Sequence, residues 1–408
     1  MLSDMSHSRV SEGGLLLALL RVRDPLLLLL LPASVALFVF IIDYRLVGQV
    51  AFDFRGTLWE PARAILEGGR IYPRPILIEV DVGNPAVYPP LFMFLSIPLG
   101  LVPVAVSAWI WVLILGLGVV AALRTLGVRD WRCYALALTS PAVVQGMFWG
   151  NLTLLLLVPL ALAWRYRERA QVSGLALAFG IAAKLFLWPV LFWLLVTRRY
   201  RAASTCAIGA SLLVLVPWTF LGFEGLLDYP ALLRVAEEVY AGNSYSLATV
   251  ASGLEVPESL GVGICALAAV VLLGGAWRVS RGRDGDQRAF ALAVAAAILG
   301  SPIVWHAYLA LLLVPLAVAW PRFSPAWLLP QSLLLVGLLP RPMVPDPPAC
   351  CRPPDVPTIA WVFVHMPPHT WLAVGSVAVV LAVTWGSIHR RSPTAVVESE
   401  AHASGTPR

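Results

Sequence analysis

The 408-residue chain is poor in charge and almost without lysine. Only 13% of its residues are charged, and Lys184 is the single lysine. This excludes an ordinary soluble domain, in which about a quarter of the residues are charged. Hydrophobic residues make up 59% of the chain, and the mean hydropathy is +0.81. The scarcity of charge therefore indicates a membrane protein.

Cysteine is also scarce, with residues at positions 133, 206, 265, 350 and 351. The first three lie in apolar segments, and the neighbouring pair Cys350 and Cys351 could form only a strained disulfide. No metal-ligand spacing occurs, so we predict neither a metal site nor a cofactor. The net charge of +6 lies largely in arginines between apolar runs, which makes it a topology signal and not a nucleic-acid surface.

Long apolar runs are abundant, many of them roughly 17 to 20 residues and able to cross a bilayer. They lack the alternation of a transmembrane barrel, so helices remain as the spanning elements. The positive-inside rule places the basic segments in the cytoplasm, namely 124–132, 165–169, 198–201, 278–288, 322 and 390–391. We predict an all-α polytopic membrane protein with about twelve transmembrane helices and both termini cytoplasmic.

Residues 1–388 are predicted to form one transmembrane domain, beginning with an uncleaved span at Leu26–Ile42. Loops at 43–88, 222–258 and 340–369 are predicted outside, and the polar tail 389–408 is predicted disordered and cytoplasmic. Prolines interrupt residues 89–123, which either cross once or fold as two short helices. The arginine pattern favours one net crossing. Within the 222–258 loop, which is expected to lie on the membrane surface, Asp228-Tyr229-Pro230 is followed by a helix-like stretch that reaches Tyr240.

Three ionisable residues stand out as functional candidates, because an ionisable side chain at or near membrane depth is costly. Asp53 follows the first predicted span and opens a helix-like stretch, although it is also compatible with a solvated loop acid or a helix N-cap. Lys184 is expected where two short helices meet, with its ammonium at the outer surface, or simply snorkelling to the interface. His306 fits either a site or an interfacial belt. Glu79 and Asp81 are more simply explained as solvated loop charges than as ligands. Gly150-Asn151 is most simply explained as a tight turn.

An ordered set of short blocks resembles the bacterial polyprenol-phosphate-mannose-dependent α-mannosyltransferases, glycosyltransferase family 87. The blocks are Asp53-Phe54, Gly68-Gly69 with Tyr72, Tyr88-Pro89-Pro90-Leu91, Gly150-Asn151-Leu152-Thr153-Leu154, Lys184-Leu185-Phe186, Asn243-Ser244-Tyr245-Ser246 and Ser301-Pro302-Ile303-Val304-Trp305. The family includes the mycobacterial enzyme that extends phosphatidylinositol mannosides. Two departures affect the acceptor and the role of His306: Thr57-Leu58-Trp59 stands where a tyrosine is usual, and the histidine directly follows Trp305.

The resemblance implies a type C glycosyltransferase fold with short extracytoplasmic surface helices and an inverting transfer in the plasma membrane. It places Asp53 as the general base in the first outside loop. We assign the donor phosphate to Lys184, Arg55 and His306, and substrate contacts to Trp59, Tyr88, Asn151, Asn243, Trp305 and Tyr308. The donor would be a polyprenyl-phosphate sugar and the acceptor a glycolipid or envelope glycan, giving an α-1,2-mannoside.

Two other classes stay open. Broken spans, prolines and a lysine at membrane depth also suit a lipid or glycolipid transporter or flippase, which predicts charges along a path to the cytoplasmic side. A non-catalytic scaffold of envelope assembly predicts no dependence on Asp53. We favour the enzyme mainly because of the resemblance, and also because the candidate polar groups gather on one face. The sugar, mannose or a relative such as arabinose, is not fixed by the sequence.

Overall fold

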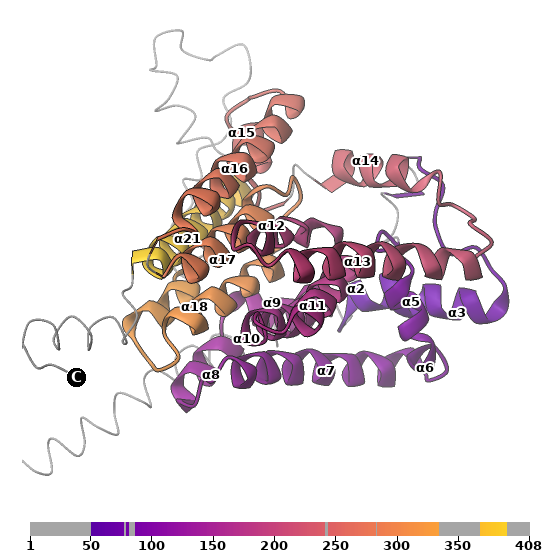
Figure 1. The fold of residues 1–408 in the computed structure, drawn as a ribbon. Helices are drawn as coiled ribbons and strands as arrows, with labels where there is room; N and C mark the ends of the chain where they lie inside the picture. Colours follow the sequence, from indigo (N-terminus) through magenta and orange to yellow (C-terminus); the bar gives the residue numbers. More distant parts are fainter. Residues whose placement is uncertain are drawn as a thin grey trace, which may run out of the picture.

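The computed structural model describes residues 50–76, 79–80, 86–240, 244–282, 284–333 and 368–389. Within these ranges the protein is built from helices and contains no strand (Figure 1). Several sequence predictions lie outside the described residues: the first span at Leu26–Ile42, Asp81, Asn243, residues 340–367 with Cys350 and Cys351, and residues 390–408 of the tail. The all-α prediction is confirmed for the part of the chain that is described.

The helices follow one another along the chain as α2 (Phe52–Phe54), π-helical η1 (Arg55–Trp59), α3 (Glu60–Glu67), α5 (Leu91–Leu95), α6 (Ile97–Gly100), α7 (Val104–Thr125), α8 (Trp131–Leu138), α9 (Pro141–Trp149), η2 (Leu152–Leu156), α10 (Leu157–Arg165), α11 (Ala170–Ala183), η3 (Leu185–Leu187), α12 (Pro189–Val196), α13 (Tyr200–Phe220), α14 (Tyr229–Tyr240), α15 (Leu247–Gly253), α16 (Glu258–Val279), α17 (Gly285–Leu299), η5 (His306–Leu312), α18 (Leu313–Ala319), η6 (Pro325–Gln331) and α21 (Pro368–His389). Here η2, η3, η5 and η6 are 3-10 helices.

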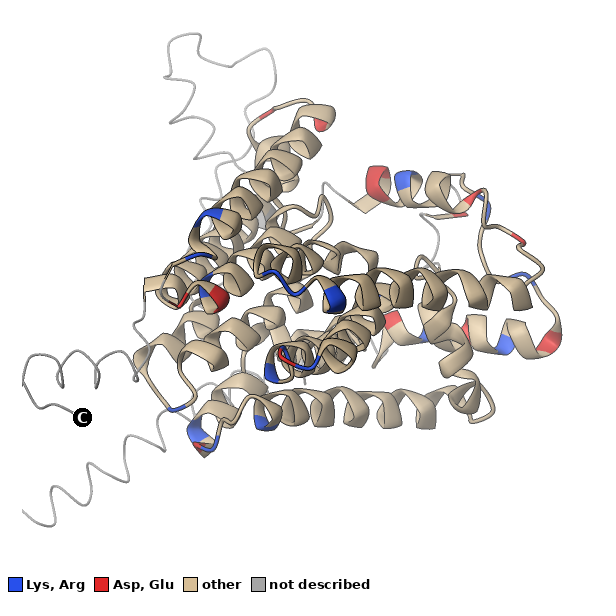
Figure 2. Ribbon diagram, in the orientation of Figure 1, with Lys and Arg blue, Asp and Glu red and all other residues tan. Residues whose placement is uncertain are grey.

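Four helices in the described ranges are long and apolar enough to cross a membrane: α7, α13, α16 and residues Thr370–His389 of α21. Charged residues are few along them and gather near helix ends and in connections (Figure 2). Four further apolar segments are shorter, at Leu152–Arg165, Ala170–Ala183, Leu185–Val196 and His306–Ala319. A helix of 14 residues is about 21 Å long, less than the roughly 30 Å of a hydrocarbon core. The protein is therefore a polytopic helical membrane protein, and the count of twelve spans and the type C fold remain predictions.

Prolines divide residues 89–123 as the sequence suggested. Pro98 lies in the first turn of α6, and Pro103 directly precedes α7 in an extended conformation. This stretch therefore forms two short helices, α5 and α6, followed by one helix long enough to cross a membrane. The predicted helical stretch after Asp53 is likewise present as α2, η1 and α3, and the helix-like stretch predicted after Asp228-Tyr229-Pro230 is present as α14.

A helical hairpin carries Lys184 at its tip. α11 ends at Ala183, Lys184 is extended, and η3 and α12 then run back. The two open ends of the hairpin meet, because Arg199 Nη2 and Glu168 Oε1 form an ion pair at 2.6 Å. The tip of the hairpin is therefore held at a fixed distance from its basic ends.

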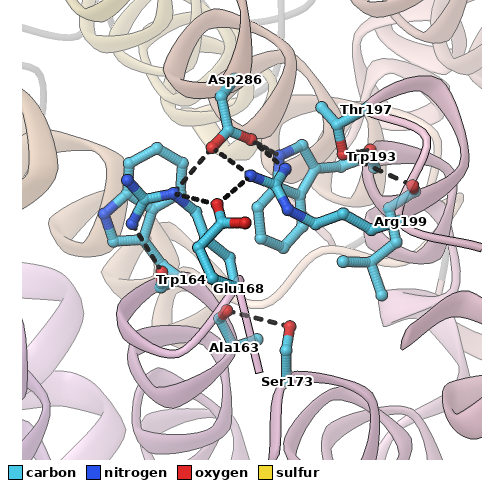
Figure 3. Close-up of polar contacts among 10 residues, drawn as sticks. Ala163, Trp164, Glu168, Ser173, Trp193, Thr197, Arg199 and Asp286 are labelled. Carbon is cyan, nitrogen blue, oxygen red and sulfur yellow. Dashed lines mark hydrogen bonds and ion pairs between the residues drawn. The ribbon is translucent and has the colours of Figure 1, made fainter. Parts of the chain in front are cut away.

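Asp286, in the first turn of α17, ties those basic ends to the rest of the bundle (Figure 3). Its carboxylate accepts hydrogen bonds from Arg167 Nε at 2.7 Å, Arg199 Nη1 at 2.8 Å and Trp193 Nε1 at 2.7 Å. One acid thus joins the α10–α11 connection, the α12–α13 connection and α17. The predicted basic segments 165–169 and 198–201 consequently lie side by side.

Candidate active site

The segment that carries Asp53 is docked on the end of α9 by a close backbone approach. Ala51 N–H donates to Phe148 C=O at 2.7 Å, and Gly150 ends α9 with a φ of +70°. A Cβ at Gly150 would lie 2.8 Å from Ala51 Cβ and 3.1 Å from Phe54 Cβ. Glycine is therefore required here for both its backbone conformation and its lack of a side chain.

Trp111 of α7 packs against the same junction between α2 and the end of α9. Its indole Nε1 donates to Gly150 C=O at 2.8 Å, and its ring stacks on Phe54 with centroids 4.9 Å apart. Both aromatic side chains are buried. The predicted tight turn at Gly150-Asn151 is present, and it positions the next residue against Asp53.

A chain of polar contacts joins Asp53 to Lys184 through Asn151. Asn151 Nδ2 donates to Asp53 Oδ2 at 2.5 Å. The opposite atom of the same amide, Oδ1, accepts from Thr153 Oγ1 at 2.6 Å and from Lys184 Nζ at 3.2 Å. Since a lysine can only donate, the carbonyl of the amide faces Lys184 and its NH₂ faces the carboxylate.

Lys184 is buried, with only 4% of its surface exposed, which corrects the expectation of an ammonium at the outer surface. Nζ also donates to Thr153 Oγ1 at 2.9 Å and lies 3.4 Å from Tyr308 Oη. It sits 4.8 Å from the ring centroid of Tyr88 and 4.5 Å from that of Tyr308, distances at which a cation is attracted to an aromatic face. The ammonium is thus held by oxygens and rings at the hairpin tip.

These residues line one cavity of about 580 Å³. Seven residues singled out from the sequence contribute to its wall: Asp53, Tyr88, Asn151, Lys184, Trp305, His306 and Tyr308. They come from α2, the segment before α5, the start of η2, the hairpin tip and the start of η5. A largely apolar, aromatic cavity of this size with a few convergent polar groups is typical of a small-molecule site.

Two predicted site residues do not line the cavity. Arg55 Nε donates back to Val50 C=O at 2.9 Å, and Trp59 Nε1 donates to Leu99 C=O at 3.1 Å. The cause is helical periodicity, because side chains four residues apart share a face. Asp53 and Thr57 lie on the face toward the cavity, whereas Arg55 and Trp59 lie on another. The i, i+4 spacing in the sequence was a usable signal for this separation.

Sequence reasoning missed several residues of the wall, among them Gln145, Glu237 and Tyr245. Glu237 belongs to α14, which two tyrosines hold in place: Tyr229 Oη donates to Val87 C=O and Tyr240 Oη to Val80 C=O, both at 2.9 Å. Burial raises the pKa of Glu237, and the nearby carboxylates of Glu258 and Glu238 raise it further. The pattern Leu233, Glu237, Tyr240 on one helix face was the available signal.

The rings around His306 complete the far side of the cavity. His306 contacts Tyr245 with ring centroids 5.3 Å apart, and Trp305 meets Tyr240 edge-on at 5.8 Å. In the described ranges, no group of three or more histidine, cysteine or acidic side chains could hold a metal ion. The residues of the cavity instead offer two carboxyl groups, those of Asp53 and Glu237, one buried ammonium and aromatic faces, a set suited to polar transfer chemistry.

A model of glycosyltransferase family 87 matches residues 86–304, more than half of the chain. The chain belongs to glycosyltransferase family 87. The matched range contains Tyr88, Asn151 and Lys184, while Asp53, Trp305, His306 and Tyr308 lie outside it. No curated protein and no solved structure matches the chain. Membership of family 87, predicted from the ordered sequence blocks, is confirmed, whereas the mannosyl and polyprenyl-phosphate specificity stays a prediction. This family 87 member is a membrane glycosyltransferase with a sugar donor and an acceptor.

Proposed function

We propose that this glycosyltransferase transfers a mannosyl residue from a polyprenyl-phosphate donor to a glycolipid or envelope glycan, with inversion at C1 and an α-1,2 linkage. The observation that carries the proposal is the placement of the Asp53 carboxylate and the Lys184 ammonium on one cavity, linked through the Asn151 amide. An inverting transfer needs one group to take a proton and another to stabilise a departing anion, and this pair offers both.

Asp53 is proposed as the general base. Its carboxylate takes the proton of the acceptor hydroxyl while that oxygen forms a bond to C1 of the sugar. Asn151 is proposed as the residue that positions the carboxylate, because its own amide is fixed by Thr153 and Lys184. A carboxylate fixed in this way can be brought within hydrogen-bond reach of a bound hydroxyl without reorganisation.

Lys184 is proposed to stabilise the leaving group. As the C1–O bond breaks, its electron pair passes to the polyprenyl phosphate, whose negative charge grows. A pre-placed ammonium in a site with little water stabilises such charge strongly. Because the charge increases during the reaction, the interaction favours the transition state over the bound donor. His306, which lines the same cavity, is proposed to contact the donor near its phosphate, and Tyr308 is proposed to contact the substrate through its aromatic ring.

The cavity wall suits a lipid-linked sugar. Phe52 and Leu185 line it and are themselves 36% and 37% exposed, which gives an isoprenoid chain apolar surface at the mouth. Deeper aromatic faces, including Trp305 and Tyr245, suit the apolar face of a pyranose ring. We place the active site on the extracytoplasmic side of the plasma membrane, opposite the arginine-rich connections.

The test is transfer of radiolabelled mannose from polyprenyl phosphate mannose to a membrane lipid extract, using purified protein in detergent. Asp53→Asn should lower turnover by at least about 10²-fold, because a positioned base contributes about that much or more. Donor binding should be retained. The matched control is Glu60→Gln, which removes an exposed acid from the first turn of α3 that does not line the cavity.

Label in a new glycolipid with wild type and Glu60→Gln, but not with Asp53→Asn, would support the proposal. Near-normal turnover by Asp53→Asn would refute the assignment of the base. If the wild type binds the donor without transferring label, arabinosyl donors are the next substrates. Movement of donor across proteoliposome membranes, independent of Asp53, would instead establish the transporter alternative.

A further inference from the structure

A second groove lies away from the cavity, on the outer side of the helical hairpin. It measures about 510 Å³ and lies where α12 packs against α13 and α16. Its lining combines two arginines, three aromatic residues and two aliphatic residues: Arg198, Arg281, Tyr200, Trp277, Phe192, Leu195 and Val196. The groove therefore combines two basic side chains with apolar and aromatic surface.

Neither arginine of the groove has an acidic partner within the described part of the chain, a property that the neighbouring Arg201 shares. Arg199 pairs with Asp286 and Glu168, and Arg167 pairs with Asp286, whereas neither Arg198 nor Arg281 forms an ion pair there. Both are exposed, and the guanidinium of Arg281 lies 5.0 Å from the ring centroid of Trp277. Their positive charge is therefore available to an anion.

A left-handed backbone at Arg198 directs the side chains of two consecutive arginines to different places. Arg198 has a φ of +61°, a left-handed conformation that glycine or asparagine usually takes at a helix end. The turn is closed by Arg198 N–H to Leu195 C=O at 3.0 Å and Arg199 N–H to Leu194 C=O at 2.8 Å. As a result Arg199 reaches Asp286 while Arg198 lines the groove.

The depth of the groove follows from the helices that border it. α13 begins at Tyr200 and α16 ends at Val279, and both helices are long and apolar enough to span a membrane. Tyr200 and Trp277 lie at these ends and are 63% and 53% exposed. Aromatic residues and arginines at the ends of spans mark the headgroup level of a bilayer. The groove therefore opens where lipid phosphates lie.

We propose that this groove binds the headgroup of an anionic phospholipid. The phosphate lies between the guanidinium groups of Arg198 and Arg281, which donate charge-assisted hydrogen bonds to its oxygens. One acyl chain follows the apolar side chains of Phe192, Leu195 and Val196. A bound lipid would brace the open end of the hairpin whose tip carries Lys184. This inference does not depend on the proposed transferase chemistry.

The test is native mass spectrometry of the purified full-length protein with phosphatidylglycerol titrated into the detergent, beside phosphatidylcholine. Phosphatidylglycerol should bind at least about fivefold more tightly than phosphatidylcholine, and removing one arginine should weaken it by about fivefold. Arg198→Gly and Arg281→Gln are the test variants. Glycine relieves the left-handed strain at 198, so that variant should melt no lower than the wild type while losing lipid.

Arg201→Gln is the matched control, because Arg201 is exposed in the first turn of α13, next to Tyr200, but does not line the groove. It should leave phosphatidylglycerol binding within about twofold. Unchanged binding by Arg198→Gly and Arg281→Gln, or equal binding of phosphatidylcholine, would overturn the proposal. Complete displacement of the lipid by millimolar inorganic phosphate would also overturn it, because the groove would then be a site for the free anion.

Discussion

The side-chain amide of Asn151 donates to the carboxylate of Asp53 at 2.5 Å, although the two residues lie 98 positions apart in sequence. The orientation of this amide is set from its other end, where Oδ1 accepts from Thr153 and Lys184. A change at Lys184 should therefore reach Asp53 through Asn151. Charge and geometry in the cavity are coupled, and the first prediction uses that coupling.

Lys184→Met should lower kcat for sugar transfer by about 10²–10³-fold, the usual effect of losing one pre-placed donor to a developing oxyanion. Methionine keeps the length and apolar stem of lysine but removes the charge and the donors to Asn151 and Thr153. Single-turnover transfer of radiolabelled mannose measures the chemical step separately from donor binding. Retained single-turnover rates would contradict the leaving-group role.

Tyr308→Phe is the control for that variant. It keeps the ring against Lys184 and its stack on Phe186, whose centroids are 4.4 Å apart. It removes only a long contact of 3.4 Å between Tyr308 Oη and Nζ. Its rate should stay within about threefold of the wild type, consistent with a net contribution of about 0.5 kcal/mol from a weak hydrogen bond.

Gly150→Ala should destabilise the protein and displace Asp53. The left-handed backbone costs about 1–2 kcal/mol for a residue with a Cβ, and crowding against Ala51 adds about 1–3 kcal/mol. Gly127→Ala is the control, because Gly127 has a φ of +82° but its Cβ would meet nothing within 4 Å. Gly150→Ala should lower both the melting temperature and the transfer rate. Gly127→Ala should lower only the melting temperature, and by less. Equal losses of activity would show that the approach of Ala51 does not position Asp53.

Local patterns in the sequence were sufficient for the parts of the fold that depend on local chemistry. The proline before α7, the break at Lys184 and the helix at Tyr229–Tyr240 each follow from residue types with strong backbone or burial preferences. Their order along the chain also indicated the family. The number of spans was not determined in this way, because apolar runs broken at Lys184 look like two spans although each half is shorter than a bilayer.

The contacts within the site could not be obtained from the sequence. Asn151 looks like a turn residue, and its role arises only when α2 docks on the end of α9 and the hairpin tip arrives from another part of the chain. Glu237 looks like one of two adjacent acids on a surface helix, and tyrosine contacts to residues more than 140 positions away place it on the cavity. Such partners depend on tertiary packing that no local pattern encodes.

Asp286→Asn should lower stability while leaving the transfer chemistry intact. Breaking a buried ion pair costs about 3–5 kcal/mol, and we expect about 2–3 kcal/mol here because the Asp286 side chain is 28% exposed. Glu67→Gln, which removes the exposed Arg63–Glu67 pair, should cost less than about 1 kcal/mol. Thermal unfolding in detergent compares the two variants. If Asp286→Asn also lowers kcat at a low temperature, where the variant is still folded, the Asp286 network affects the active site as well.

The raised pKa of Glu237 predicts how stability depends on pH. Burial comes first among its causes, followed by the carboxylates of Glu258 and Glu238, and all of them disfavour the charged form in the folded protein. Between the pKa of the unfolded chain, near 4.5, and the higher folded pKa, the folded protein binds more protons than the unfolded one. Stability from this group is therefore present at low pH and is lost as pH rises through that window.

Glu237→Gln should consequently raise the melting temperature at pH 7 and have no effect at pH 4, where the wild-type carboxyl is protonated in both states. Glu258→Gln should give a smaller gain of the same sign, because it removes one of the carboxylates that raise the pKa of Glu237. Glu60→Gln, at an exposed position away from the cavity, should change neither value. Melting curves at the two pH values decide the matter. A lower melting temperature for Glu237→Gln at pH 7 would mean that the ionised carboxylate makes a stabilising contact which outweighs its burial.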